Sequence, residues 1–478
     1  MTRPMPNDAN LQGAYAPLGV ECDAPDLVVK GELPSDLAGT YYRNGPDPLH
    51  APRDGDTYHW FDGDGMIHGF NIEDGRVSWR NRWVQTRKYE LERAAGRKLY
   101  GVFGNPMFSD PAVVSEEYNT ANTNIVEHQG RLLALMEGAL AVEIEPKSLA
   151  TKGTVSFDGQ ISGPITAHPK IDLKTGEMIF FGYSATGPGS KTLRYNVADK
   201  NGKLIRNEFF DAPYAAMVHD FFVTETHAIF PIFPVTTSIE RVMTGGPMMA
   251  WEPEQGAHFG VIPRNGTAAD VRWFSSDARF MFHMMNAWTD GSKLHADVTG
   301  ANATQFAPKL DGRMADAADG VAPTFRRWTV DLADNTNAIK EELFDDFICE
   351  FPRTDDRVST YAYRHGYAVG TPSREFGGFS HLLHYDTHKG NQRRTWTPGE
   401  GQDGAHTFTI RVTDAGGALY NAIGLELRPE FAALLMSLSS IIVATNAVLL
   451  KREGSRMQAM DNVPTELVEG TQMRRRNA

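Results

Sequence analysis

From about residue 32 to residue 397 the chain is a succession of short apolar runs separated by turn residues. The runs are rich in Val, Ile, Phe, Tyr and Trp, as in GRVSWRNRWVQTRKY, RLLALMEGALAVEI and GEMIFFGYSA. Turn dipeptides separate them, including Asp74-Gly75, Gln129-Gly130, Asn201-Gly202 and Asp290-Gly291. This spacing is typical of strands joined by tight hairpins. Helical periodicity is sparse, so the pattern predicts an all-β protein.

The length of this β-rich region favours a β-propeller over a sandwich. A region of roughly 400 residues of strand needs many sheets or radial repetition to avoid exposed edges. No fixed short repeat is visible, so the pattern leaves the number of blades open.

The last part of the chain, residues 404–478, has a different composition. Residues 431–450, FAALLMSLSSIIVATNAVLL, contain no charge and are followed by Lys451 and Arg452. A stretch of this length can cross a bilayer as a helix, with the basic pair as its cytoplasmic flank. The alternative is a buried helix, because Ser and Thr interrupt the apolar run. A membrane contact through residues 431–450 is therefore one of two expectations.

Composition narrows the class of protein. The 478 residues are 41% hydrophobic and 22% charged, as in a globular protein with a large core. Acidic residues outnumber basic ones by 60 to 47, and this charge of −13 argues against a nucleic-acid partner. The two cysteines, Cys22 and Cys349, exclude a disulfide framework and a thiolate metal site. The N-terminus lacks the apolar core of a signal peptide, so we expect a cytoplasmic location.

Three histidines, His168, His219 and His283, lie in or beside apolar runs. A lone histidine in such a run is usually a core residue with satisfied hydrogen bonds, and the three are too far apart in sequence to form a local chelating pair. A shared metal requires several strands to converge, which the axis of a propeller provides. Neutral imidazoles suit Fe, Zn or Cu and leave positions open for a small molecule. Spacing alone leaves both hypotheses open.

Two carboxylates also stand in apolar surroundings: Glu137 in LLALMEGALAVEI and Glu350 in FICEFPRTDD. Buried carboxylates need a partner, and ligating histidines need an acceptor for their second ring nitrogen. The alternative is that each glutamate faces water or pairs with an arginine. Among the other histidines, His59 and His68 fit surface strand positions, and His381 and His384 fit a metal pair only if they lie on a helix.

Six segments occur together in a specific order. They are LPSDLAGTYYRNGPDP, HWFDGDGMIHGF, TAHPKIDLKTGEMIFFGYS, MVHDFFVTETHAIF, FMFHMMNAW and CEFPRTDDR. Together they closely resemble the carotenoid cleavage oxygenase family. The segments HMMNAWTDGSKLHADV and ERAAGRKLYGVFGNP look most like the bacterial lignostilbene dioxygenases within it. The resemblance covers approximately residues 15–400, and we take residues 1–403 as the propeller domain.

The resemblance implies a seven-bladed β-propeller capped by loops and short helices, with a non-haem Fe(II) on its axis. His168, His219 and His283 match three of the family's four histidine ligands, and Glu137 and Glu350 match carboxylates that orient ligand histidines. The implied reaction uses O₂ to cleave a conjugated C=C bond, of a stilbenoid or an apocarotenoid, into two carbonyl products.

The implied substrate pocket departs from that of the lignostilbene dioxygenases. Those enzymes carry a tyrosine and a lysine that bind the phenol of the substrate, and the matching positions here are Phe103 and Met136. Neither side chain can hydrogen-bond to a hydroxyl as those residues do. Phe61 of the WFDGDG segment still offers an aromatic wall. We therefore expect a more apolar pocket that favours apocarotenoids or non-hydroxylated aryl alkenes.

The C-terminal part departs further. After Thr397 the sequence lacks the family's fourth-histidine motif, its closing strand and its third orienting glutamate, and the last histidine is His406. The propeller is therefore expected to be incompletely closed, followed by a helical tail. The segment ALYNAIGLELRPEFAALLMSLSSIIVATNAVLLKR instead resembles the end of a heavy-metal P-type ATPase. The alternative to an active enzyme is an impaired propeller that binds a hydrophobic ligand.

Overall fold

Most of the chain folds into antiparallel sheets of four strands. The structure is a computed structural model, which describes residues 4–12, 16–29, 33, 36–53, 58–103, 109–372, 379, 381–396, 409–411 and 418–420. The first sheet has the order β1-β4-β3-β2, with β1 Cys22–Ala24, β2 Gly39–Pro46, β3 Gly65–Glu73 and β4 Arg76–Trp83. The second runs β5-β6-β7-β8, with β5 Asn124–His128, β6 Arg131–Leu135, β7 Val142–Ile144 and β8 Thr151–Thr154.

Two further four-stranded sheets follow along the chain. One has the order β12-β11-β10-β9, with β9 Lys170–Asp172, β10 Glu177–Gly182, β11 Thr192–Ala198 and β12 Leu204–Asp211. The other runs β13-β14-β17-β18, with β13 Phe222–Val223, β14 His227–Ile232, β17 Ala257–Pro263 and β18 Arg272–Ser276. Beside it, β15 Val235–Thr237 pairs with β16 Met249–Trp251.

The remaining large sheet is a meander of seven strands, in chain order from β19 to β25. Its strands are β19 Phe280–Asp290, β20 Lys293–Ala301, β21 Thr324–Asp331, β22 Lys340–Thr354, β23 His365–Thr371, β24 His381–Asp386 and β25 Gln392–Trp396. The long strand β22 pairs with β21 through its first part and with β23 through its last part. The meander therefore amounts to two four-stranded units that share β22.

Helices are few among the described residues, as the sequence pattern predicts for the β-rich region. The α-helices of the described residues are α1 Arg87–Ala95 and α2 Ile239–Met243. Thr86 caps α1 by accepting from the backbone N–H of Tyr89, and Gly96 ends it with a φ of +63°. The described part of the chain is thus all-β with short helical additions, and the expected all-β class is confirmed, while the number of blades stays a prediction.

The predicted turn dipeptides form the hairpins expected of them. Asp74 and Gly75 join β3 to β4 with φ angles of 49° and 71°, and Gln129 and Gly130 join β5 to β6 with 57° and 74°. Two successive residues with positive φ match the right-handed twist of the flanking strands. The turns therefore fix the register of these strand pairs locally.

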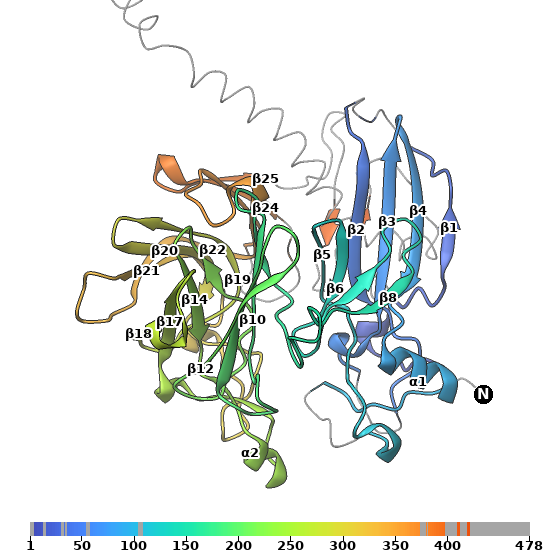
Figure 1. The fold of residues 1–478 in the computed structure, drawn as a ribbon, viewed down its shortest axis with the longest axis horizontal. Helices are drawn as coiled ribbons and strands as arrows, with labels where there is room; N and C mark the ends of the chain where they lie inside the picture. The colour runs from blue at the N-terminus through green and yellow to red at the C-terminus, as the bar shows by residue number, and fades with distance from the viewer. Residues whose placement is uncertain are drawn as a thin grey trace, which may run out of the picture.

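Figure 1 shows the blue β1–β4 sheet at one side of the molecule, with β5, β6 and β8 next to it. The labelled strands from β10 to β25 lie on the other side, with β24 and β25 above β10. Large aromatic side chains such as Trp328, Phe222, Phe259 and Phe233 fill the core between neighbouring sheets, and all four are almost fully buried. Strands such as β10 are buried along nearly their whole length, because sheets pack against both of their faces.

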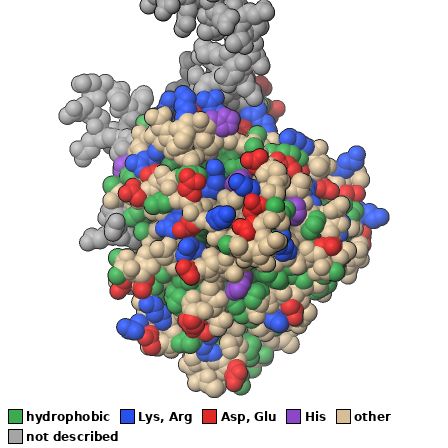
Figure 2. Space-filling view, turned by 90° about the vertical axis from the view of Figure 1, so that its left-hand side faces the viewer, with side chains coloured by type: hydrophobic (Ala, Val, Ile, Leu, Met, Phe, Trp, Pro, Cys, Tyr) green, Lys and Arg blue, Asp and Glu red, His purple; other side chains and the backbone are tan. Residues whose placement is uncertain are grey.

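Parts of the expected architecture fall outside the described residues. Residues 431–450 and His406 are among them. Within the expected tail the structure describes two short strands, β26 Thr409–Arg411 and β27 Ala418–Tyr420, which pair with each other. None of the helices that the structure describes has the length and apolarity needed to cross a membrane. On the face shown in Figure 2, acidic and basic side chains are interspersed, so the net charge is not gathered into one patch there.

A buried amide provides a test of how the meander is held together. Asn286 of β19 is 2% exposed; its Nδ2 donates to the carbonyls of Val358 and Tyr361, at 3.0 and 2.8 Å, and its Oδ1 accepts from Thr360 N–H. Asn286→Ala leaves these backbone groups unsatisfied, and we expect it to destabilise the fold by about 3 kcal/mol. Thermal denaturation measures the effect. Exposed Asn207 is the control, and an equal loss in Asn207→Ala would contradict the prediction.

Candidate metal centre

Three histidine rings from three consecutive sheets meet at one point. His168 lies two residues before β9, His219 lies three residues before β13, and His283 lies in β19. The Nε2 atom of His219 lies 3.0 Å from that of His168 and 3.3 Å from that of His283. Within the described residues this is the group of side chains that could hold a metal ion. The structure therefore brings together the three histidines that the sequence predicted as ligands.

Two glutamates orient two of these rings from behind. Glu137, in the turn between β6 and β7, accepts from Nδ1 of His219 at 2.6 Å. Glu350 of β22 accepts from Nδ1 of His283 at 2.9 Å. A carboxylate acceptor on Nδ1 fixes the ring tautomer and leaves the Nε2 lone pair facing the centre. Both glutamates therefore contact histidines, rather than water or an arginine as the alternative supposed.

Burial and charge keep the donor set suited to a cation. Burial, together with the neighbouring rings of His219 and His283, holds the pKa of His168 well below its usual 6.5, so this ring is neutral. For His219, burial opposes protonation, but the charge of Glu137 outweighs it and raises the pKa. A proton on Nε2 of His219 can be donated to the lone pair of only one neighbouring ring. A metal cation can bind the Nε2 lone pairs of all three rings, so the three histidines fit a metal bound by neutral imidazoles.

Bulges in two strands aim the side chains of this site. The register of β19 against β20 shifts on either side of Met284, next to His283, and that of β22 against β23 shifts between Glu350 and Arg353. Phe351, within the second irregularity, has a φ of +52°, and its N–H donates to the Glu350 carboxylate. A bulge re-aims side chains out of the regular alternation. The contact between His283 and Glu350 thus depends on both irregularities.

A row of aromatic rings leads away from the histidines. The ring of Phe282 lies 5.3 Å from that of His219 and 5.3 Å from that of Phe306. Phe306 in turn lies 6.5 Å from Phe61 and 6.0 Å from Phe103, and these last two rings are 5.1 Å apart. We call Phe282, Phe306, Phe61 and Phe103 the aromatic row. It connects two expected substrate residues to the histidine cluster by continuous ring contacts.

The WFDGDG segment holds one end of this row in place. The carboxylate of Asp62, which is fully buried, accepts from the backbone N–H of Phe103 at 2.7 Å and from that of His59 at 3.2 Å. A Cβ atom at Gly65 would lie 2.3 Å from the carbonyl oxygen of Ala121, so only glycine fits there. Asp62 and Gly65 therefore hold the loop that carries Phe61 in place, and their role is not to contact the three clustered histidines.

The structure places the remaining candidate residues. Met136 lies beside Thr120, whose N–H and hydroxyl approach its sulfur at 3.3 and 3.6 Å, and its expected contact with a substrate stays a prediction. His68, expected at a strand surface, is buried in β3, because Trp79 covers it and donates its indole N–H to Nδ1. His381 and His384 lie on β24, not on a helix.

Tyr183 is a site residue that the sequence analysis missed. It directly follows β10, and its hydroxyl donates to Oε1 of Glu137 at 2.8 Å, while Oε2 of the same carboxylate accepts from His219. Burial and the charge of Glu137 raise the pKa of Tyr183 well above its usual value, so it stays a donor. Its position at the end of the GEMIFFGYS run was the available signal, but 46 residues separate it from its partner.

Comparison with known proteins identifies the family. Residues 15–408 match the family model described as retinal pigment epithelial membrane protein. The chain therefore belongs to this family, that of the carotenoid cleavage oxygenases, and the resemblance found in the sequence is confirmed. The likeness of the tail to a P-type ATPase stays a prediction.

Individual relatives agree with this assignment. The chain is 36% identical over 411 residues to isoeugenol monooxygenase of Pseudomonas nitroreducens, covering 84% of this chain and 85% of that protein. It is 36% identical to lignostilbene-alpha,beta-dioxygenase isozyme III of Sphingomonas paucimobilis, covering 86% and 87% of the two chains. The crystal structure of Pseudomonas brassicacearum lignostilbene dioxygenase matches with a TM-score of 0.79 at 35% identity, covering 88% and 94%.

Removing an orienting carboxylate tests the site. Glu137→Ala leaves Nδ1 of His219 and the Tyr183 hydroxyl without their acceptor, and we expect divalent-metal affinity to fall by about 10–100-fold. Glu143→Ala in β7 is the matched control, because that glutamate pairs with Arg131 and Lys152 instead. Metal titration of both purified variants measures the difference. Equal affinities in the two variants would show that Glu137 has no part in the site.

Proposed function

We propose that this protein is a non-haem Fe(II) dioxygenase that cleaves a conjugated C=C bond of a hydrophobic alkene into two carbonyl products. The observation that carries the proposal is the convergence of three histidine Nε2 atoms with carboxylates behind two of the rings. The named activities of the relatives support the reaction class, because lignostilbene dioxygenase and resveratrol cleavage oxygenase are among them. A ferrous ion held there would supply activation of dioxygen.

The residues of the chain have separate roles in this proposal. His168, His219 and His283 hold the ion as neutral donors, while Glu137 and Glu350 fix the rings of His219 and His283. The aromatic row excludes water next to His219 and offers ring faces to a flat conjugated molecule. The substrate binds beside the ion rather than on it, so shape and stacking select it.

The substrate class follows from the same row. Phe61 and Phe103 contact each other and Phe306, and these three rings carry no group that can hydrogen-bond. We propose that Phe61, Phe103 and Met136 contact the substrate, and that it is an aryl alkene or apocarotenoid without a required hydroxyl. Dioxygen is the second substrate.

The wider organisation completes the proposal. The sheets are taken as blades of a seven-bladed propeller within residues 1–403, with residues 404–478 as a separate tail and a cytoplasmic location. The alternative is an impaired propeller that binds a hydrophobic ligand without turnover. What favours that alternative is that the family's fourth-histidine motif does not occur after Thr397, where His406 is the last histidine.

Iron content and oxygen uptake separate the two hypotheses. The purified chain, reconstituted with ferrous ion, is expected to retain iron stoichiometrically and to consume O₂ with a stilbene or an apocarotenoid. His283→Ala removes one donor and is expected to abolish both, whereas His381→Ala, on β24, preserves them. Iron retention without O₂ uptake supports the impaired propeller. Full iron occupancy in His283→Ala contradicts the ligand assignment.

Substrate preference tests the aromatic row. In the double variant Phe103→Tyr and Met136→Lys, polar groups replace two apolar ones, and one new hydrogen bond is worth about 1 kcal/mol. We expect kcat/KM for a hydroxylated stilbene, relative to that for its methyl ether, to rise by about 5–10-fold. Initial rates with both compounds measure the ratio, and Phe209→Tyr on exposed β12 is the control. An unchanged ratio would remove these two residues from the substrate site.

A further inference from the structure

The segment that carries His168 needs a different support from the other two ligand segments. Carboxylates hold Nδ1 of His219 and of His283, whereas no carboxylate of the described residues hydrogen-bonds to the His168 ring. The backbone N–H of His168 donates to the Thr166 hydroxyl at 3.0 Å, which is a contact within its own loop. A residue close to His168 must therefore connect this loop to the neighbouring strands.

The carboxylate of Asp220 makes that connection. Its Oδ1 accepts from Lys170 Nζ at 2.5 Å, and Lys170 lies two residues after His168. Its Oδ2 accepts from the backbone N–H of Met284 at 3.3 Å, the residue that follows His283. Asp220 itself directly follows His219. The carboxylate of the residue that follows His219 thus contacts a residue two positions from His168 and the residue next to His283.

Burying the ion pair between Asp220 and Lys170 has a desolvation cost, so the pair needs a role other than stabilising the fold. The side chains of Asp220 and Lys170 are 3% and 15% exposed, so both charges have lost most of their hydration. A buried ion pair is weak as a source of stability, because desolvation offsets much of the attraction. Its hydrogen bonds are nevertheless strong and directional. Such a pair is better suited to fixing geometry than to stabilising the fold.

We propose that Asp220 is a positioning residue for the metal centre. Its carboxylate holds the β9, β13 and β19 segments at the spacing that allows their three histidine Nε2 atoms to bind one ion. The bulged register beside Met284 places the N–H of that residue toward Asp220. The inference rests on the proposed metal site and is independent of which alkene is cleaved.

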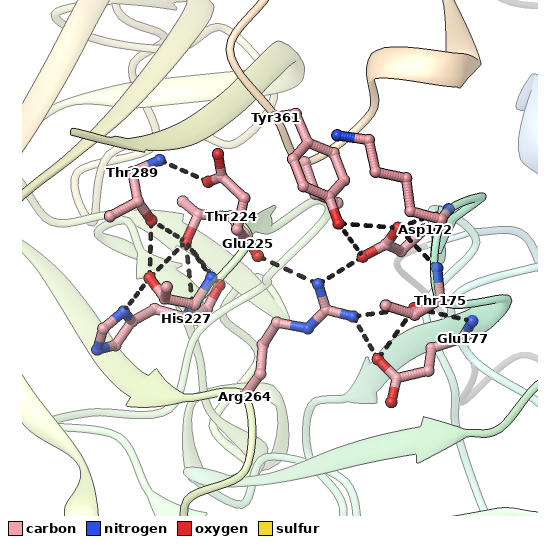
Figure 3. Close-up of polar contacts among 12 residues, drawn as sticks. Asp172, Thr175, Glu177, Thr224, Glu225, His227, Arg264, Thr289 and Tyr361 are labelled. Atoms are coloured by element: carbon pink, nitrogen blue, oxygen red, sulfur yellow. Dashed lines mark hydrogen bonds and ion pairs between the residues drawn. The ribbon is translucent and has the colours of Figure 1, made fainter. Parts of the chain in front are cut away.

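The same β9 hairpin offers a matched control in Asp172. Figure 3 shows its carboxylate between Arg264 and Tyr361, with Nη1 of Arg264 at 2.7 Å and the Tyr361 hydroxyl at 3.2 Å. It also accepts from the N–H groups of Lys174 and Thr175. Asp172 therefore joins three separate parts of the chain, as Asp220 does, and is fully buried. None of its partners in these contacts is a ligand histidine or adjacent to one.

Cobalt binding tests the proposal directly. Co(II) reports both affinity, by competition with a chelator, and coordination geometry, through its visible spectrum. We expect Asp220→Ala to lower Co(II) affinity by about 10–100-fold and to alter the spectrum, because the His168 and His283 segments lose their common anchor. Asp220→Asn and Lys170→Met should change both in the same direction by less. Asp172→Asn should lower the melting temperature and leave affinity and spectrum unchanged.

Amide hydrogen exchange of the metal-free protein gives a readout that needs no metal. Exchange in residues 166–170, 217–221 and 281–285 should rise in the Asp220 variants, whereas Asp172→Asn should not raise it at 281–285. Wild-type affinity and spectrum in Asp220→Ala would overturn the proposal; if that variant does not fold, Asp220→Asn and Lys170→Met decide it by the same criteria. If the wild type binds Co(II) yet cleaves no alkene, the proposed function fails and the role of Asp220 stands.

Discussion

The central constraint on this protein is that three imidazole rings point their Nε2 atoms at one another in a largely buried place. His219 approaches His168 and His283 through Nε2 at 3.0 and 3.3 Å, which is unfavourable unless a proton or a cation lies between the rings. The protein keeps this arrangement by fixing the outer side of the rings. Glu137 and Glu350 accept hydrogen bonds from Nδ1 of His219 and His283, so the Nε2 lone pairs of these two rings stay available to bind a cation.

The sheet architecture supplies these groups one at a time. Glu137, His168, His219, His283 and Glu350 come in chain order from successive four-stranded units, so no single sheet contains the site. The regular strand has to be broken where a side chain turns toward the centre. The register shifts beside Met284 and after Glu350, and the left-handed φ of Phe351, occur at those places.

The histidine cluster and the aromatic row form one continuous series of ring contacts. Phe282 contacts His219 on one side and Phe306 on the other, and Asp62 holds the backbone of Phe103 at the far end. Hydrogen-bonding groups thus lie behind the histidine rings and at the loop that carries Phe103, while an aromatic ring lies beside His219. This separation suits the proposed function, in which the site holds a cation and accepts an apolar alkene.

Local rules made the strands predictable from sequence. The Asp74-Gly75 and Gln129-Gly130 turns and the alternation around them fixed hairpins, and the family motifs indicated His168, His219, His283, Glu137 and Glu350. The tertiary structure decided which partners meet. Tyr183 reaches Glu137 across 46 residues, and Asp220 reaches Lys170 across 50 and Met284 across 64. Turn and strand preferences act over a few residues, whereas these contacts depend on how whole sheets pack, which no local pattern encodes.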